Sequence, residues 1–189
     1  MMRMNAAVVL ALCGWLTGCG AGGGSGGDAG PVVVPADLDV TDPRTLPTTG
    51  RATYDGYMRA ELPTGDDGSR ENYLADLRME VNFATGFDQI RGQATGFEAG
   101  GARRLGGALT ISGGDVYRDT DTSAAYTFDG ALNGTLTDGS DDYLIDAEIE
   151  GDFLGADQTA VGGLVFGDIT GPEGIDIFDG TFAADRVAD

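Results

Sequence analysis

Apolar and polar residues alternate along much of the chain after residue 50. The pattern is clearest in residues 73–83 (YLADLRMEVNF) and returns in residues 143–153 (YLIDAEIEGDF). Because successive side chains of an extended strand point to opposite faces, each stretch predicts a β-strand with one apolar and one largely charged face. Strands of this kind form antiparallel sheets that have one face in water. The residues expected on the apolar faces are Tyr73, Ala75, Leu77, Met79, Val81 and Phe83, and Tyr143, Ile145, Ala147, Ile149, Gly151 and Phe153.

Six further segments show a weaker form of this alternation, and none has a convincing helical period. They lie near residues 50–62, 88–98, 105–112, 124–136, 160–169 and 175–184, with turn-rich segments between them. Eight short strands joined by hairpin turns predict an all-β fold, an eight-stranded antiparallel up-and-down β-barrel, because closure leaves no exposed sheet edge. Glycines inside the predicted strands indicate where a small barrel bends tightly. These are Gly92, Gly96, Gly130, Gly134 and Gly151.

The first thirty residues have a different pattern, an apolar run followed by almost pure glycine and serine. Arg3 precedes the run, which has the length of a signal peptide and is shorter than the ~20 apolar residues of a membrane-spanning helix. The run ends in LTGC at residues 16–19, which matches the bacterial lipobox. Cys19 is therefore the expected site of lipidation. The alternative is an ordinary secretory signal that contains an incidental cysteine.

This interpretation divides the chain into four parts. Residues 1–18 are the expected lipoprotein signal peptide, 19–30 a lipidated Gly/Ser-rich tether, 31–49 a proline-rich extended lead-in and 50–189 the β-barrel domain. A tether of this composition behaves as a flexible coil. The glycine that follows the cysteine favours anchoring in the outer membrane, with the cell surface as the expected side and the periplasmic face as the alternative.

A barrel that crosses a membrane shows the same alternation of residues. Aromatic girdles are not evident in this sequence, and its loops do not divide into a short and a long set. A lipid anchor would also be redundant on a spanning barrel. These features favour a barrel that stands in water.

Composition narrows the classes of function. The chain has 31 acidic and 11 basic residues, a formal net charge of −20 and no histidine. Such a chain repels phosphate backbones, so nucleic acid is not an expected partner. Without histidine the chain lacks the commonest metal ligand and the usual base for nucleophilic catalysis, which excludes zinc enzymes and Ser-His-Asp hydrolases. We expect no catalytic residues, no metal site and no resident cofactor, and a monomeric state.

Glycine and phenylalanine recur in a specific pattern near the end of the chain, in residues 151–166 (GDFLGADQTAVGGLVF) and 178–186 (FDGTFAADR). The first segment is similar to G-x-F-x-G-x-x-A-x-x-x-G-G, which occurs in the barrel domains of transferrin-binding protein B. Related bacterial surface lipoproteins, including factor H-binding protein and haem-acquisition proteins, share this arrangement. The matching residues are Gly151, Phe153, Gly155, Gly162 and Gly163, with a displaced alanine at 156 or 160, and then Phe178, Gly180 and Phe182.

The resemblance covers residues 50–186 as one barrel and implies a non-enzymatic binding lipoprotein of the outer membrane. It would capture a protein, or an iron- or haem-related ligand, for a partner transporter. The motif itself is structural and carries no ligand contacts. Two alternatives remain open: a lipocalin-like carrier with a small molecule in the barrel interior, and a structural envelope lipoprotein without a ligand.

Several residues are candidates for a binding site. Arg103 and Arg104 are the only adjacent positive pair and could hold an anionic ligand or carboxylates of a partner. Carboxylates in residues 119–123 and 138–142 suit calcium but lack EF-hand spacing, so solvated loops are expected there. Acidic pairs such as Glu148 and Glu150 resemble the two carboxylates of a glycosidase. Two acidic residues on the same face of a strand are common, however, so the pair does not indicate catalysis. The remaining side chains able to ligate haem, for which packing is the expected role, are Tyr54, Tyr57, Tyr73, Tyr117, Tyr126, Tyr143, Met58 and Met79.

Overall fold

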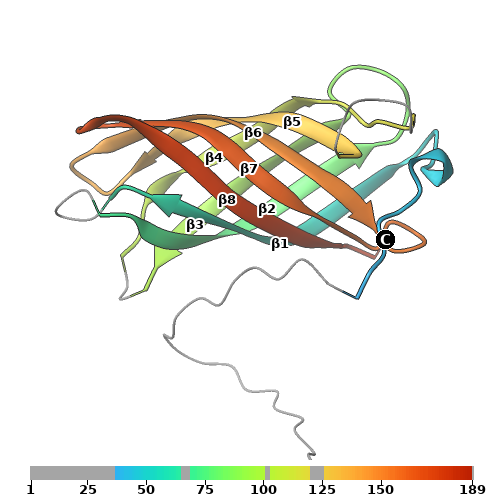
Figure 1. Ribbon diagram of the computed structural model, residues 1–189, viewed down its shortest axis with the longest axis horizontal. Helices are drawn as coiled ribbons and strands as arrows, with labels where there is room; N and C mark the ends of the chain where they lie inside the picture. The colour runs from blue at the N-terminus through green and yellow to red at the C-terminus, as the bar shows by residue number, and fades with distance from the viewer. Residues whose placement is uncertain (1–36, 65–68, 101–102, 120–125, 189) are drawn as a thin grey trace, which may run out of the picture.

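The computed structural model describes residues 37–64, 69–100, 103–119 and 126–188, which form an antiparallel β-barrel (Figure 1). Each strand pairs with the next, and the last pairs with the first, so the predicted eight-stranded up-and-down barrel is confirmed. A short 3-10 helix, η1 (Pro43–Thr45), precedes the barrel. The strands are β1 (Arg51–Leu62), β2 (Glu71–Asn82), β3 (Ile90–Ala99), β4 (Gly106–Gly114), β5 (Phe128–Thr137), β6 (Asp142–Leu154), β7 (Ala160–Gly171) and β8 (Gly174–Arg186).

The inner and outer faces of the strands follow the alternation of the sequence. All of the residues expected on the apolar faces of β2 and β6 are buried. Side chains such as Arg78, Glu80 and Glu148 alternate with them and lie on the outer wall. Charged side chains thus occupy mid-strand positions where a barrel embedded in lipid carries an apolar band.

Aromatic rings fill the barrel near one of its ends. The ring of Phe153 lies 5.1 Å from that of Phe128, 5.5 Å from that of Phe83 and 6.3 Å from that of Tyr54, measured between centroids. All four side chains are fully buried or nearly so. An eight-stranded interior is just wide enough for packed side chains or for one small ligand. In this half of the barrel, packed side chains take the space.

The two ends of the barrel differ. We call the end at which β1, β3, β5 and β7 finish the open end; residues 63–70, 100–105, 138–141 and 172–173 connect the strands there. The opposite, closed end carries the lead-in to β1, the other three connections and the last residues of β8 (Figure 1, right). Because the number of strands is even, the chain enters and leaves the barrel at the closed end.

Residues ahead of β1 cover the closed end. The Thr41 backbone N–H donates to the Phe153 carbonyl at 2.8 Å, and the Thr41 hydroxyl donates to the Gly155 carbonyl at 2.6 Å. Arg118 reaches across the same end and donates to the carbonyls of Phe83 and Pro47 at 2.6 and 2.9 Å. The predicted signal peptide, Cys19 and the tether lie outside the described residues.

Two glycine features shape the strands. Gly96 has a φ of +69° and lies where the β2–β3 register shifts, so it forms a β-bulge with the backbone conformation that glycine favours. Gly151 and Gly163 pair across β6 and β7, and a Cβ on Gly163 would come within 2.0 Å of the Glu150 carbonyl oxygen. The motif glycines therefore let two strands and their packed rings approach closely.

The fifth strand begins later than predicted in the described part of its segment. The sequence predicted a strand near residues 124–136, of which 124 and 125 lie outside the described residues, and β5 begins at Phe128. Thr127, just ahead of it, takes part in a local network: its backbone N–H donates to the Gly151 carbonyl and to the Asp152 carboxylate, both at 3.0 Å. At this point these bonds take the place of the regular hydrogen bonds between paired strands.

Candidate functional site

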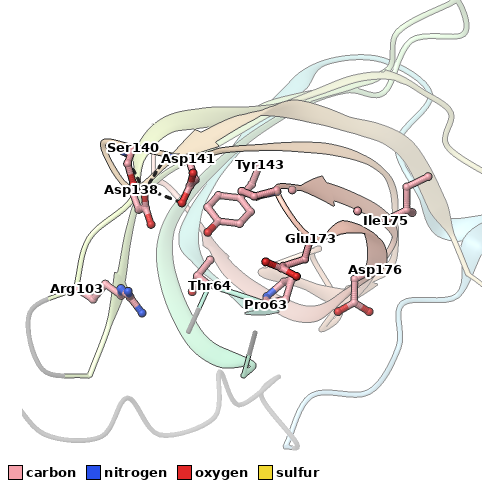
Figure 2. Close-up of a pocket in the computed structure, with 13 residues that line it drawn as sticks. Pro63, Thr64, Arg103, Asp138, Ser140, Asp141, Tyr143, Glu173, Ile175 and Asp176 are labelled. Carbon is pink, nitrogen blue, oxygen red and sulfur yellow. Dashed lines mark hydrogen bonds between the residues drawn. The ribbon is translucent and has the colours of Figure 1, made fainter. Parts of the chain in front are cut away.

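A depression of about 740 Å³ lies at the open end of the barrel (Figure 2). We call it the open-end mouth. Its lining comes from the connections β1–β2, β3–β4, β5–β6 and β7–β8, and from the adjoining ends of β6, β7 and β8. The polar and charged residues that line it include Arg103, Asp138, Asp141, Tyr143, Glu173 and Asp176.

A hydrogen-bonded group lies behind Thr64 and Arg103, which line the mouth. The buried Thr64 and Tyr73 hydroxyls are 2.8 Å apart, and Tyr73 also donates to Glu71 Oε2 at 3.1 Å. Arg103 Nη1 donates to the same Glu71 oxygen at 3.1 Å. Burial raises the pKa of Tyr73, so its hydroxyl stays protonated as the donor that this arrangement needs.

The β5–β6 turn holds a carboxylate at the rim. Asp138 Oδ1 accepts the backbone N–H groups of Ser140 and Asp141 at 3.1 and 3.0 Å. Aspartate followed by glycine favours such a side-chain-to-backbone turn, and Gly139 has a φ of +99°. The backbone N–H groups of Asp141 and Ser140 hold the pKa of Asp138 below its usual value. The carboxylate is thus ionised at neutral pH.

Tyr143 lies between the two sets of rim carboxylates in the view of Figure 2. Only 5% of the residue is exposed, and its ring packs over Gly171, where a Cβ would come within 2.9 Å of the Tyr143 Cδ1 atom. Its hydroxyl reaches the mouth and has no hydrogen-bond partner among the described residues. Burial, and then the charges of Asp138 and Asp141, raise the pKa of Tyr143, so the group remains a neutral phenol.

The β7–β8 turn supplies further negative charge. Glu173 and Asp176 line the mouth from this turn and from the start of β8. Asp176 accepts the Ile177 backbone N–H at 2.7 Å and lies 3.4 Å from Arg70 on the outer side. The carboxylates of the mouth outnumber Arg103, which itself pairs with Glu71. The mouth is therefore electronegative.

The chain was compared with protein-family models, with curated proteins and with solved structures. No match was found. The resemblance to transferrin-binding protein B therefore stays a prediction that rests on the glycine–phenylalanine motif.

The structure separates the two candidate arginines. Arg103 lines the mouth, whereas Arg104 pairs with Glu98 at 2.7 Å and has a side chain that is 72% exposed. Both guanidinium groups thus already face carboxylates of their own chain. A joint anion site would need both side chains to turn toward one ligand.

The other candidates lie apart from the mouth, with two exceptions. Glu148 and Glu150 are on the outer wall of β6, and of residues 119–123 only Asp119 falls within the described part. In that described part, no group of three or more Asp, Glu, Cys or His side chains could hold a metal ion, and no helix is long and apolar enough to cross a membrane. The exceptions are segment 138–142 and Tyr143, which the structure brings to one site.

The sequence does not distinguish Tyr143 from the other tyrosines. The alternation of apolar and polar residues correctly placed Tyr143 on the inner face, next to the DGSDD turn. The unpaired hydroxyl and the opposing β7–β8 turn are relations in space that no spacing along the chain reveals. Tyr54 shows the contrast, because its buried hydroxyl donates to the Gln158 carbonyl at 3.0 Å.

Proposed function

We propose that this protein is a lipid-anchored, non-enzymatic binding protein of the outer membrane that holds its ligand at the open-end mouth. The observation that supports this proposal is the open-end mouth. Its volume of about 740 Å³ lies within the ~300–1,000 Å³ of typical ligand sites. Loops on a rigid scaffold are common places for binding residues.

The position of the mouth supports the anchored arrangement. The lead-in to β1 approaches the barrel at the closed end (Figure 1), and the mouth is at the opposite end. A tether that begins at a lipidated Cys19 would therefore leave the mouth facing away from the membrane. Acyl chains contribute ~0.8 kcal/mol per buried CH₂, so several of them would make attachment durable.

The packed interior favours binding at the mouth over binding along the barrel axis. Phe83, Phe128 and Phe153 occupy the closed half, so a lipocalin-like ligand would have to displace buried side chains. A ligand at the mouth displaces only water. By the resemblance, this ligand would belong to an uptake system and pass to an outer-membrane transporter.

Native mass spectrometry of the mature lipoprotein, purified gently in detergent from its host, tests this proposal. Ser140→Trp places a large side chain at the rim, and Asp157→Trp places the same side chain at an exposed turn of the closed end. We expect a bound species in the wild type and in Asp157→Trp that is lost in Ser140→Trp. Apo protein in all three samples would favour a structural envelope role, and an equal bound species in all three would place the ligand elsewhere.

A further inference from the structure

Two independent observations at the mouth point to the chemistry of a ligand. The first is the Tyr143 hydroxyl, which belongs to a residue more than nine-tenths buried and has no hydrogen-bond partner among the described residues. The Tyr143 oxygen is open to the mouth, since no buried side-chain oxygen or nitrogen among the described residues lacks a hydrogen-bond partner. Its hydrogen-bonding capacity is therefore available to water or to a ligand. The second is the excess of carboxylates around that hydroxyl.

The carboxylates form two separate sets. Asp138 and Asp141 belong to the β5–β6 turn, and Glu173 and Asp176 belong to the β7–β8 region. Tyr143 follows the first set on β6, and its ring packs on Gly171 immediately before the second turn. Among the described residues the carboxylates do not gather into a group that could hold a metal ion. This spread suits a ligand with charges at more than one position.

We propose that the open-end mouth binds a small organic cation with two or more ammonium groups, of the diamine or polyamine class. One ammonium group donates to the Tyr143 oxygen and to the carboxylates of the β5–β6 turn. A second ammonium group lies against Glu173 and Asp176, and the alkyl chain between them covers the tyrosine ring. A neutral tyrosine accepts such a bond through its oxygen lone pairs, and its ring face attracts cations. This inference rests on the proposed function, since it names the ligand of the same mouth.

The charge of the whole molecule supports a cationic ligand. The chain carries a formal net charge of −20, and a cleft lined by one sign of charge concentrates ligands of the opposite sign. Arg103 is a single opposing charge at the rim, and its pairing with Glu71 at 3.1 Å partly offsets that charge. Since the rim is open to water, salt should screen the attraction, and binding should weaken as ionic strength rises.

Isothermal titration of the mature lipoprotein in detergent tests the inference, with putrescine and spermidine as probes. We expect saturable binding of both at low salt. n-Butylamine has the four carbons of putrescine with one ammonium group fewer, and it should bind at least ten-fold more weakly. Tyr143→Phe should weaken spermidine binding about ten-fold, as expected for one lost hydrogen bond to a charged group. Tyr57→Phe removes the same hydroxyl from the outer wall, where the residue is 52% exposed, and should change nothing.

Glu173→Gln, on an exposed turn, provides a second variant if Tyr143→Phe does not fold, and it should also weaken spermidine binding. Absence of binding to either amine at millimolar concentration, or equal affinity of wild type and Tyr143→Phe, would overturn the inference. If native mass spectrometry still shows a bound species that Ser140→Trp removes, the proposed function stands with a ligand of another class. If neither experiment shows a ligand, both proposals fail.

Discussion

Gly163→Ala tests the close approach of β6 and β7 that the motif glycines permit. A Cβ at residue 163 would lie 2.0 Å from the Glu150 carbonyl oxygen and 2.6 Å from the Gly151 Cα atom. Both are main-chain atoms in the middle of a paired ladder, so no side-chain rotation relieves the clash. Relief requires the two strands to separate, which disturbs the barrel on both sides of β7.

The expected cost follows from this geometry. Inserting a methyl group into a packed interior costs typically 1–3 kcal/mol, and the upper part of this range applies when the backbone must move. We therefore expect Gly163→Ala to lower the free energy of unfolding by about 3 kcal/mol. Domains of this size are stable by about 5–15 kcal/mol, so the loss should be easy to measure.

Urea unfolding followed by far-UV circular dichroism provides the assay, with Gly100→Ala as the matched control. Gly100 has no atom within 4 Å of a built Cβ, and it is exposed. The same chemical change there should leave the free energy of unfolding unaltered, or raise it by a few tenths of a kcal/mol because alanine reduces the conformational entropy of the unfolded chain. A Gly163→Ala protein within about 1 kcal/mol of the wild type would refute the close-approach argument.

Three further predictions follow from other parts of the molecule. Arg118→Met leaves the Phe83 and Pro47 carbonyls without their guanidinium donor and should cost about 3 kcal/mol in urea unfolding; an unchanged midpoint would contradict this. Burial raises the pKa of Tyr54 to about 12, above its unfolded value near 10, so its contribution to stability is complete below pH 10. That contribution, about 2 kcal/mol, should be lost as the pH rises from 10 to 12, and Tyr54→Phe should remove this part of the pH dependence. Cys19→Ala should abolish palmitate labelling and release the protein from membranes on detergent-free washing, whereas full retention would refute the anchor.

The alternation of apolar and polar residues was sufficient to predict the barrel. Successive side chains point to opposite faces in any β-strand, so this period of two is a property of the strand backbone itself. It placed Tyr143 and Phe153 on the inner face without any knowledge of their neighbours. The start of β5 was harder to predict, because the bonds that replace the ladder at Thr127 come from Gly151 and Asp152, far along the chain.

The candidate site depended even more on contacts between distant residues. Arg103 and Arg104 are adjacent in sequence, yet they pair with acids on different strands, Glu71 and Glu98. An adjacent pair on an extended segment points to opposite sides, so its members do not act together by default. The mouth itself arises from turns that come together only when the barrel closes.

The even number of strands has a practical consequence for measurement. The Arg186 and Val187 backbone N–H groups donate to the Thr159 and Thr53 carbonyls, both at 2.8 Å, which fixes the end of β8 beside the start of β1. An affinity tag or fluorescent reporter fused to the C-terminus would therefore emerge on the side remote from the open-end mouth. Capture by such a tag on a sensor chip would orient every molecule alike, with its rim toward the flowing solution and free for titration.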